Sequence, residues 1–171
     1  MKLLRIWMLL VGSLWLASGF TQPQKLLLLL GATKAPAPNQ WLAYKARPQL
    51  AKVPAALPVR IAVDSKYWLW VNDSLVVWEG GLKRGPRPGD GYVDTLDLAP
   101  WLRPGENTLA VLVWYFGQDG FSHQNSGQPG LWFEAPGWEE LAWRARPHPA
   151  FLPDTLPPFP NYRLPESNVV F

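Results

Sequence analysis

Apolar and polar residues alternate with a period of two through the middle of the chain, and this pattern is typical of β-strands with one buried face. In residues 59–64 the aliphatic side chains share one face. In residues 67–71 the alternation places Trp68 and Trp70 on one face and the remaining apolar side chains on the other. Both segments are therefore predicted to be strands.

A hairpin follows from residues 72–74, because Asn and Asp tolerate the left-handed backbone angles of a tight turn. Residues 75–78 form its returning arm. Further strands are expected over 92–98, 108–116, 131–134 and 143–146. Residues 108–116 are apolar on both faces and are predicted to be central, whereas 143–146 are predicted to close one edge. With no helix longer than two turns expected, the fold class is all-β, an antiparallel β-sandwich.

The N-terminal region is expected to be an export segment followed by a linker. Residues 1–19 combine a positive start, an apolar stretch and a small-residue cleavage site, which predicts a signal peptide and an exported, periplasmic or extracellular protein. The apolar stretch is too short for a stable membrane span, which needs about 20 residues; an uncleaved anchor is the alternative. Residues 20–38 hold the apolar run Leu26–Leu30, either an extension of the export segment or an exposed strand, and a Pro-containing linker.

The sandwich itself is assigned to residues 39–146, and residues 147–171 are assigned to a proline-rich strap. Seven prolines fall within residues 147–165, a density that cannot continue a helix or a central strand. Phe151, Phe159 and Tyr162 within this strap suggest that it packs on a surface. Residues 168–171 resemble the opening of a strand, so the chain is interpreted as a fragment truncated before a further domain.

Composition excludes several classes of protein. There are 16 Lys and Arg against 13 Asp and Glu, and removal of Lys2 and Arg5 with the signal would leave 14 against 13, a net charge of about +1. This balance argues against nucleic-acid binding. The absence of Cys excludes a disulfide scaffold, a thiolate zinc site and a Cys nucleophile. Eleven Trp residues must mostly contribute to a core.

Five segments in fixed order carry a family resemblance: DSKYWLWVN at 64–72, EGGLKRGP at 79–86, DLAPWLRPGENTL at 97–109, VWYFGQDGFSH at 113–123 and NYRLPESN at 161–168. Together, over residues 41–171, they resemble the N-terminal β-sandwich region of bacterial α-L-rhamnosidases of glycoside hydrolase family 78. The resemblance implies a galactose-binding-like jelly roll ahead of an (α/α)6 catalytic barrel, and substrates that carry terminal α-L-rhamnose.

No catalytic residue is assigned to this chain, because in that family the catalytic carboxylates lie on the barrel. Glu79, Asp90, Asp94 and Asp97 are the only dense group of carboxylates. An inverting glycosidase needs an acid and a base about 6.5–9.5 Å apart, but the odd spacing of Asp94 and Asp97 directs them to opposite faces of one strand. These carboxylates are expected to pair with nearby basic residues instead.

No cofactor is expected. His123 and His148 are too far apart in sequence to indicate a metal site. Calcium bound by Asp90, Asp94 or Asp119 with loop carbonyls is an alternative without a spacing motif.

Sugar binding has candidate residues. A pyranose stacks its apolar face on an aromatic ring, and Trp68 and Trp70 with Asn72 beyond them are predicted to offer such a platform for a rhamnose-containing glycan. Trp114 and Phe116 are a second candidate pair if their face is open. The competing interpretation is that these rings are core or domain interface.

Two loops are predicted to dock on the catalytic barrel of the same parent protein. Their candidate residues are Lys83, Arg84, Arg87, Asp90, Asp119, Phe121 and His123. The sequence thus predicts a non-catalytic domain of an exported rhamnosidase-like glycosidase. A stand-alone carbohydrate-binding module and a structural interaction domain without sugar binding remain the alternatives.

Overall fold

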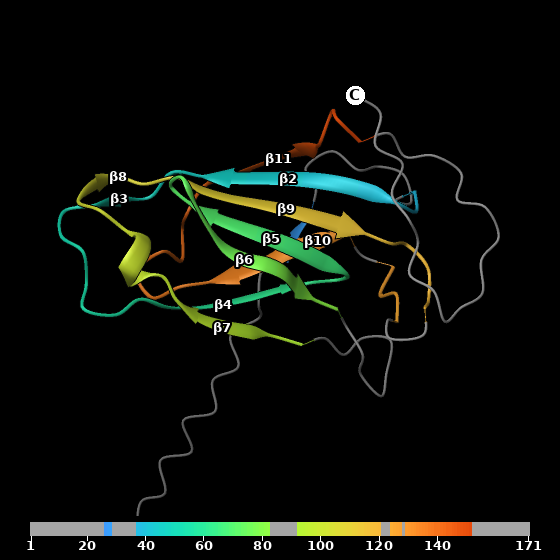
Figure 1. Cartoon of the computed structure of the whole chain (residues 1–171), viewed down its shortest axis with the longest axis horizontal. Helices are drawn as coiled ribbons and strands as arrows, with labels where there is room; N and C mark the ends of the chain where they lie inside the picture. The colour runs from blue at the N-terminus through green and yellow to red at the C-terminus, as the bar shows by residue number, and fades with distance from the viewer. Residues whose placement is uncertain (1–25, 29–36, 83–91, 121–123, 128, 152–171) are drawn as a thin grey trace, which may run out of the picture.

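The chain folds as two antiparallel sheets packed face to face, seen in a computed structural model that describes residues 26–28, 37–82, 92–120, 124–127 and 129–151 (Figure 1). One sheet has the order β1-β10-β4-β7, and the other has the order β11-β2-β9-β5-β6. The predicted all-β sandwich is confirmed.

The four-stranded sheet consists of β1 (Leu26–Leu28), β10 (Gly130–Glu134), β4 (Pro58–Val63) and β7 (Asp94–Asp97). The five-stranded sheet consists of β11 (Trp143–Pro147), β2 (Gln40–Ala46), β9 (Leu109–Tyr115), β5 (Lys66–Val71) and β6 (Ser74–Gly81). Two short strands, β3 (Gln49–Leu50) and β8 (Gly105–Glu106), pair beside the sandwich, and a 3-10 turn spans Ala99–Trp101.

The predicted strands correspond to β4, β5, β6, β7, β9, β10 and β11, whereas β2 was not among the predicted strands. The strand expected over 108–116 is β9, and it lies at the centre of its sheet between β2 and β5. The strand expected over 143–146 is β11, at the edge beside β2. The strand expected over 92–98 is shorter, because the backbone after Asp97 enters the 3-10 turn.

The apolar run of residues 26–30 had two open interpretations, and the structure places its first three residues in a strand. Residues 26–28 form β1, which pairs antiparallel with β10 at the edge of the four-stranded sheet. The signal peptide expected over 1–19 and most of the predicted linker lie outside the described residues. Within the described ranges, no helix has the length and hydropathy that a membrane span needs.

The main core lies between the two sheets and is built by the period-two alternation. In β5, Tyr67, Leu69 and Val71 point inward and are fully buried. Val111 of β9 faces both Leu69 and Tyr44, so the central strand contributes to the core along its length. Burial of apolar surface contributes roughly 25 cal/mol per Å², and this inter-sheet layer is the main source of stability.

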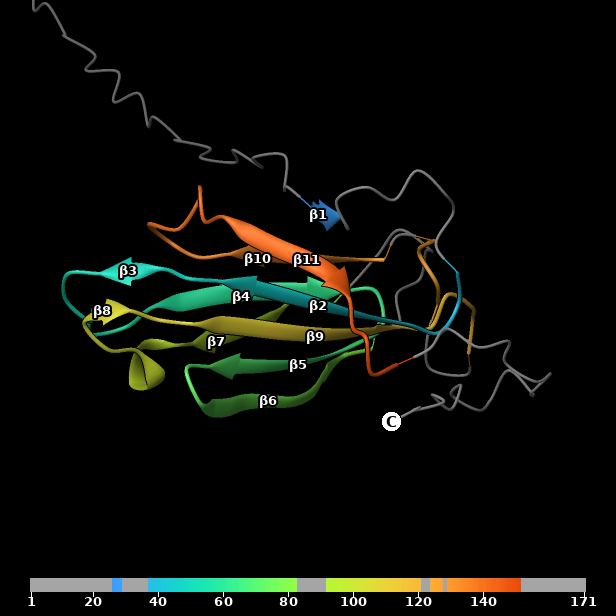
Figure 2. The same ribbon diagram turned by 90° about the horizontal axis from the view of Figure 1, so that it is seen from above.

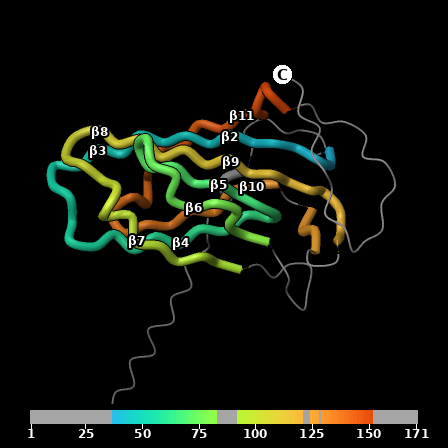
Figure 3. The backbone as a smooth tube through the Cα atoms, in the orientation of Figure 1, coloured from blue at the N-terminus to red at the C-terminus, as the bar shows by residue number. Residues whose placement is uncertain are grey.

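The turns gather at two ends of the sandwich. Figure 3 shows β3, β8 and the 3-10 turn at one end, together with the β5–β6 turn, whereas the segments that follow β9 lie at the other end. The predicted turn at the β5–β6 hairpin is confirmed, since Asn72 has a φ of 54°. These two ends and the outer face of the five-stranded sheet are the places where function has to be sought.

Candidate functional site

The outer face of the five-stranded sheet carries a second hydrophobic cluster, made of aromatic rings. Trp41 of β2, Trp68 of β5 and Trp114 of β9 form it together with Phe116, which follows β9. Because the inner side chains of these strands already build the main core, the sheet is apolar on both faces. Figure 2 looks onto this sheet, with β11, β2, β9, β5 and β6 side by side. We call this surface the aromatic face.

Trp41 is the centre of the aromatic face. Its ring stacks on Trp114 at 4.8 Å and on Trp68 at 5.3 Å between ring centroids. Phe151, which follows β11, stacks on it more closely, at 4.1 Å with an interplanar angle of 12°. The backbone N–H of His148 donates to the carbonyl of Trp41 at 2.8 Å, and this bond holds the segment just before Phe151 against β2. Four aromatic rings from three strands and one following segment thus share one stack.

Three of the predicted sugar-binding rings are buried within this face. Trp68 and Trp114 are at most 9% exposed, and Phe116 is fully buried. Trp114 Nε1 donates to Asn39 Oδ1 at 2.9 Å, and Phe116 packs edge-on against the Trp114 ring. Trp70 is only partly buried beside them. The flat faces of the innermost rings are therefore occupied by other rings of the protein.

Asn72, the remaining sugar-binding candidate, lies at the β5–β6 turn and is bound to neighbouring loops. Its side-chain Nδ2 donates to Trp101 O at 2.8 Å and to Asn107 Oδ1 at 3.1 Å, and its Oδ1 accepts the backbone N–H of Thr108 at 3.0 Å. Both ends of the amide are thus engaged in holding the turn against the 3-10 corner. The structure does not bring Asn72 together with Trp68 and Trp70 as one open platform.

Trp78 is the most exposed large apolar side chain in the described part of the chain. It lies on edge strand β6, is 72% exposed, and contacts the Trp68 ring edge-on at 6.4 Å. The aromatic face therefore runs from Phe151 at the β11 side to Trp78 at the β6 side. Its first half is covered, and its β6 end is open.

The carboxylates that sequence analysis weighed for catalysis hold the fold together. Asp94 Oδ2 accepts the Tyr67 hydroxyl at 2.7 Å and the Gly81 N–H at 3.2 Å. Asp97 Oδ1 accepts the backbone N–H groups of Leu57 at 2.8 Å and Ala99 at 3.0 Å. In the described residues these two carboxylates therefore bind backbone and hydroxyl donors where basic partners had been expected.

Glu79 does have a basic partner, Lys66, at 3.1 Å. Asp90, with the predicted loop cations Lys83, Arg84 and Arg87, lies outside the described residues.

The end of the sandwich beyond β9 holds a polar network around Asp64. This buried carboxylate accepts the Ser65 hydroxyl at 3.1 Å and the Ser126 backbone N–H at 2.7 Å. Burial, followed by the charge of Asp64, raises the pKa of Tyr115. Asp119 accepts the Asn125 backbone N–H at 2.8 Å and so shapes the loop internally.

The calcium and docking-loop predictions stay predictions. Among the described residues, no group of three or more acidic, His or Cys side chains is arranged to hold a metal ion. Of the docking candidates only Asp119 is described; Phe121 and His123 lie outside the described residues, as do those of the 83–91 loop.

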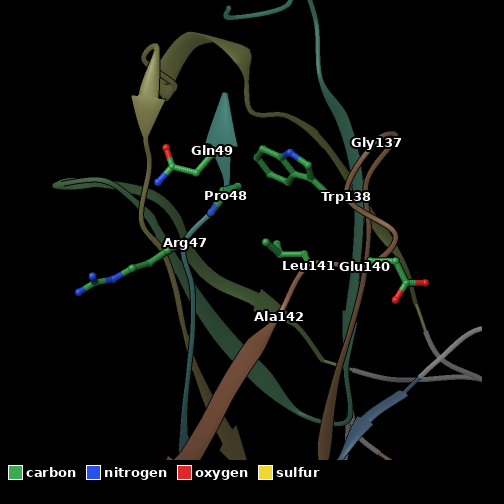
Figure 4. A pocket seen from close by; sticks show the side chains of 8 residues that line it. All are labelled: Arg47, Pro48, Gln49, Gly137, Trp138, Glu140, Leu141 and Ala142. Atoms are coloured by element: carbon green, nitrogen blue, oxygen red, sulfur yellow. The ribbon is translucent and has the colours of Figure 1, made fainter. Parts of the chain in front are cut away.

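A shallow pocket of about 290 Å³ lies at the opposite end, between the start of β3 and the segment that connects β10 to β11. In Figure 4 the Trp138 indole and Leu141 face Pro48 across it, while the side chains of Arg47, Gln49 and Glu140 extend outward. Arg47 and Gln49 both also approach Glu106, at 3.6 and 3.4 Å. The pocket thus offers one indole and a polar rim.

Sequence analysis missed the residues that organise these surfaces. Trp41, Trp78 and Trp138 were not singled out. The stacking of Phe151 on Trp41 joins residues 110 positions apart, a contact no local pattern predicts. Only the aromatic content of residues 147–165 pointed to a surface contact.

The solved structures that match the fold include two rhamnosidases with a TM-score above 0.5. A family 78 rhamnosidase of Bacillus sp. GL1 is 31% identical, with a TM-score of 0.53, over 67% of this chain and 12% of that one. An α-L-rhamnosidase of Aspergillus terreus is 16% identical, with a TM-score of 0.51, over 74% of this chain and 17% of that one. The second likeness is one of fold alone.

No protein-family model matches the chain, and a search of curated proteins found no match. The chain spans 12% and 17% of the lengths of the two rhamnosidases. Identity of 31% on a shared sandwich nevertheless confirms the resemblance seen in the five sequence segments. The chain is similar, in sequence and in fold, to a β-sandwich region of the α-L-rhamnosidases of glycoside hydrolase family 78.

Proposed function

We propose that this chain is a non-catalytic β-sandwich domain of an exported α-L-rhamnosidase-like glycoside hydrolase that acts on rhamnose-containing glycans. The observation that carries the proposal is its 31% identity to 12% of a family 78 rhamnosidase, a share far smaller than the whole enzyme. In this role the sandwich would pack against a catalytic domain, which the resemblance implies to be an (α/α)6 barrel, and would help to shape its glycan cleft.

The chemistry of the described carboxylates supports a non-catalytic role. Asp94 and Asp97 each accept two hydrogen bonds from the fold, and Glu79 is paired with Lys66. A general acid and a general base must both reach a substrate from opposite sides at a separation of about 6.5–9.5 Å. Asp94 and Asp97 are each held in place through one carboxylate oxygen by bonds to the backbone and, for Asp94, to Tyr67, and are therefore poorly suited to that task.

A chimera tests this proposal. The sandwich region of the Bacillus enzyme is replaced by residues 41–171 of this chain, and the product is compared with an enzyme from which the region is simply deleted. We expect the chimera to be soluble and to hydrolyse p-nitrophenyl α-L-rhamnoside, and the deletion variant to be insoluble or inactive. The isolated chain should show no turnover. A chimera no better than the deletion, or turnover by the isolated chain, would contradict the proposal.

A stand-alone carbohydrate-binding role is the second candidate, and the Trp138 pocket favours it. The pocket, of about 290 Å³, is lined by the indole of Trp138, a ring of the kind on which the apolar face of a sugar stacks. Calorimetry with L-rhamnose and rhamnose-bearing oligosaccharides tests this role. Loss of binding in Trp138→Ala would place the site in the pocket, and loss in Trp70→Ala would place it on the aromatic face. Flat titrations would favour a structural interaction domain.

Export is tested separately. Expression of the full chain in a secreting host, followed by intact-mass measurement, should give a product that starts near residue 20 and appears outside the cytoplasm. A full-length product retained inside the cell would contradict export.

A further inference from the structure

The open β6 end of the aromatic face combines an exposed indole with an exposed carboxylate. We propose that it is a carbohydrate-binding site, in which Trp78 stacks on the apolar face of a neutral pyranose and Glu79 accepts hydrogen bonds from the sugar hydroxyls. The site is separate from the Trp138 pocket. The inference rests on the proposed function for its choice of sugar probe, whereas its geometry comes from the described residues alone.

A β-bulge in the hairpin of β5 and β6 sets the two side chains next to each other. The register of the two strands shifts between Tyr67 and Leu69, so that Trp78 and Glu79 of β6 both lie opposite the single residue Trp68 of β5. In a regular strand, successive side chains point to opposite faces. A bulge breaks this alternation and re-aims a side chain, and bulges are over-represented beside active sites.

The contacts of the two side chains place both on the outer face of the sheet. Trp78 touches the ring of Trp68 edge-on at 6.4 Å between centroids. Glu79 Oε2 accepts a hydrogen bond from Lys66 Nζ at 3.1 Å. Lys66 and Trp68 share one face of β5 because they are two residues apart, and Trp68 belongs to the aromatic cluster. The indole and the carboxylate are thus presented together where Figure 2 shows β6 at the edge beside β5.

The backbone holds Glu79 in a fixed and unusual conformation. Its φ of 55° lies in the left-handed region, which is uncommon for a residue other than glycine. The strand is anchored directly after it, since the N–H of Gly81 donates to Asp94 Oδ2 at 3.2 Å. The ion pair with Lys66, whose side chain is 10% exposed, orients the carboxylate itself. Backbone strain of this kind clusters at ligand-binding and active sites, where it is part of a preorganised geometry.

The exposure of the two groups fits a sugar. The Trp78 residue is 72% exposed and the Glu79 side chain is 43% exposed, so both are accessible from solvent. A pyranose offers an apolar C–H face to a ring and hydroxyl donors to an acceptor, and hydrogen bonds to an ionised carboxylate are stronger than those between neutral groups. Because the carboxylate is exposed whereas the Lys66 ammonium is nearly buried, the site favours a neutral sugar over an anionic one.

The same features argue against a protein strand as the occupant. An added strand needs a continuous row of unpaired backbone groups along the edge, and bulges and charged side chains on an edge strand hinder such pairing. The register of β6 is interrupted at the bulge, and Glu79 carries a charge there. Charged residues are also depleted in the core of protein–protein interfaces.

NMR of the full chain with isotope-labelled tryptophan tests the proposal. The indole N–H signals of Trp78 and Trp138 are identified by their loss in Trp78→Phe and Trp138→Phe. We expect methyl α-L-rhamnoside to shift the Trp78 signal in a saturable manner and to leave the Trp138 signal in place. The methyl glycoside of galacturonic acid, an anionic sugar, should bind more weakly.

Two variants test the assigned roles by calorimetry with the same rhamnoside. Trp78→Ala, at an exposed position, should weaken binding at least about tenfold. Glu79→Gln keeps the shape but removes the charge, and should weaken binding about three- to tenfold. Trp101→Ala, at another exposed tryptophan, is the matched control and should bind as the unmodified chain does. Thermal unfolding establishes that each variant is folded.

The contrary outcomes are distinct. A Trp78 signal that does not move with the methyl glycosides of rhamnose, galactose or glucose would overturn the proposal, as would unchanged binding by Trp78→Ala. A signal that moves on dilution without sugar would show that a second copy covers the ring instead. An active chimera whose sandwich binds no sugar would refute this inference alone, whereas sugar binding beside an inactive chimera would refute the proposed function alone.

Discussion

The hydroxyl of Tyr67 donates a hydrogen bond of 2.7 Å to Asp94 Oδ2, and this bond joins the two sheets of the sandwich. Tyr67 belongs to β5 of the five-stranded sheet, whereas Asp94 begins β7 of the four-stranded sheet. The same carboxylate oxygen accepts the backbone N–H of Gly81 at 3.2 Å, so it also fixes the end of β6. One acidic side chain thus holds three strands together at this end of the fold.

Stability should fall at alkaline pH because Tyr67 is buried and hydrogen-bonded to Asp94. Burial first, and then the hydrogen bond and charge of Asp94, raise the pKa of Tyr67 above its ordinary value of about 10. A group whose pKa is raised on folding stabilises the fold fully below the unfolded pKa, and this contribution is lost as the pH rises through the folded pKa. Urea midpoints measured upward from pH 9 should therefore decline, and Tyr67→Phe should decline less steeply. The exposed Tyr92→Phe is the control and should follow the unmodified chain.

Gly80→Ala should destabilise the protein through a clash with Tyr67. A Cβ at this position would collide with the Tyr67 ring, although the backbone of Gly80 itself needs no left-handed angle. Overpacking of this kind costs about 1–3 kcal/mol. Gly105→Ala is the comparison variant. A Cβ at position 105 would meet no atom within 4 Å, although the backbone of Gly105 has a φ of 88°. If thermal unfolding shows Gly80→Ala to be as stable as the unmodified chain, the ring is not held against β6.

Trp41→Ala should destabilise the sandwich strongly, because this ring stacks on Trp68, Trp114 and Phe151. Removal of a buried tryptophan typically costs about 3–5 kcal/mol. Trp78→Ala removes a ring of the same size that is 72% exposed and should cost less than about 1 kcal/mol. Chemical denaturation of both variants checks the contrast. Equal losses would mean that the aromatic face does not contribute to stability in the way its stacking indicates.

Asn72→Ala should behave as a structural mutation. It removes the acceptor of the Thr108 N–H and the donor to Trp101 O, and it places Ala at a φ of 54°. Unsatisfied partners and a strained backbone together should cost about 1–3 kcal/mol of unfolding free energy. Asp73→Ala, its exposed neighbour in the turn, should change stability little. An unchanged melting temperature together with lost glycan binding would instead support the sugar-binding prediction for Asn72.

Period-two alternation predicted most of the longer strands, because it records which side chains face the inter-sheet core, but β2 was missed. Residues 109–115 alternate fully buried inner positions with apolar outer ones, and this double-sided character identified β9 as central. The very short strands β3 and β8 could not be predicted, since two residues carry no period. The turn that leads into β8 is held by the side chain of Asn107, which bonds the backbone of Arg103 and Gly105.

The candidate site was less predictable than the fold. The sequence indicated outward-facing Trp residues on β5, but it could not say whether other rings cover them. Coverage depends on Trp41 from β2 and on Phe151 from beyond β11, which reach the same place only after the strands are ordered in the sheet. Likewise, the sequence predicts a basic partner for Asp94, whereas the packing of the two sheets brings the hydroxyl of Tyr67 to it.

The amino-acid sequence by itself determined the fold class, the hairpin, the central and edge strands, and the resemblance to family 78 rhamnosidases. These properties depend on the local alternation of apolar and polar residues, on turn residues and on short ordered motifs. All of these can be recognised in the amino-acid sequence. Only the tertiary structure decided that one sheet is apolar on both faces, which rings are covered, and which carboxylates are already bonded. Those properties arise from contacts between strands that are distant in sequence. Such contacts form, and contribute to the free energy of folding, only when the two sheets pack together.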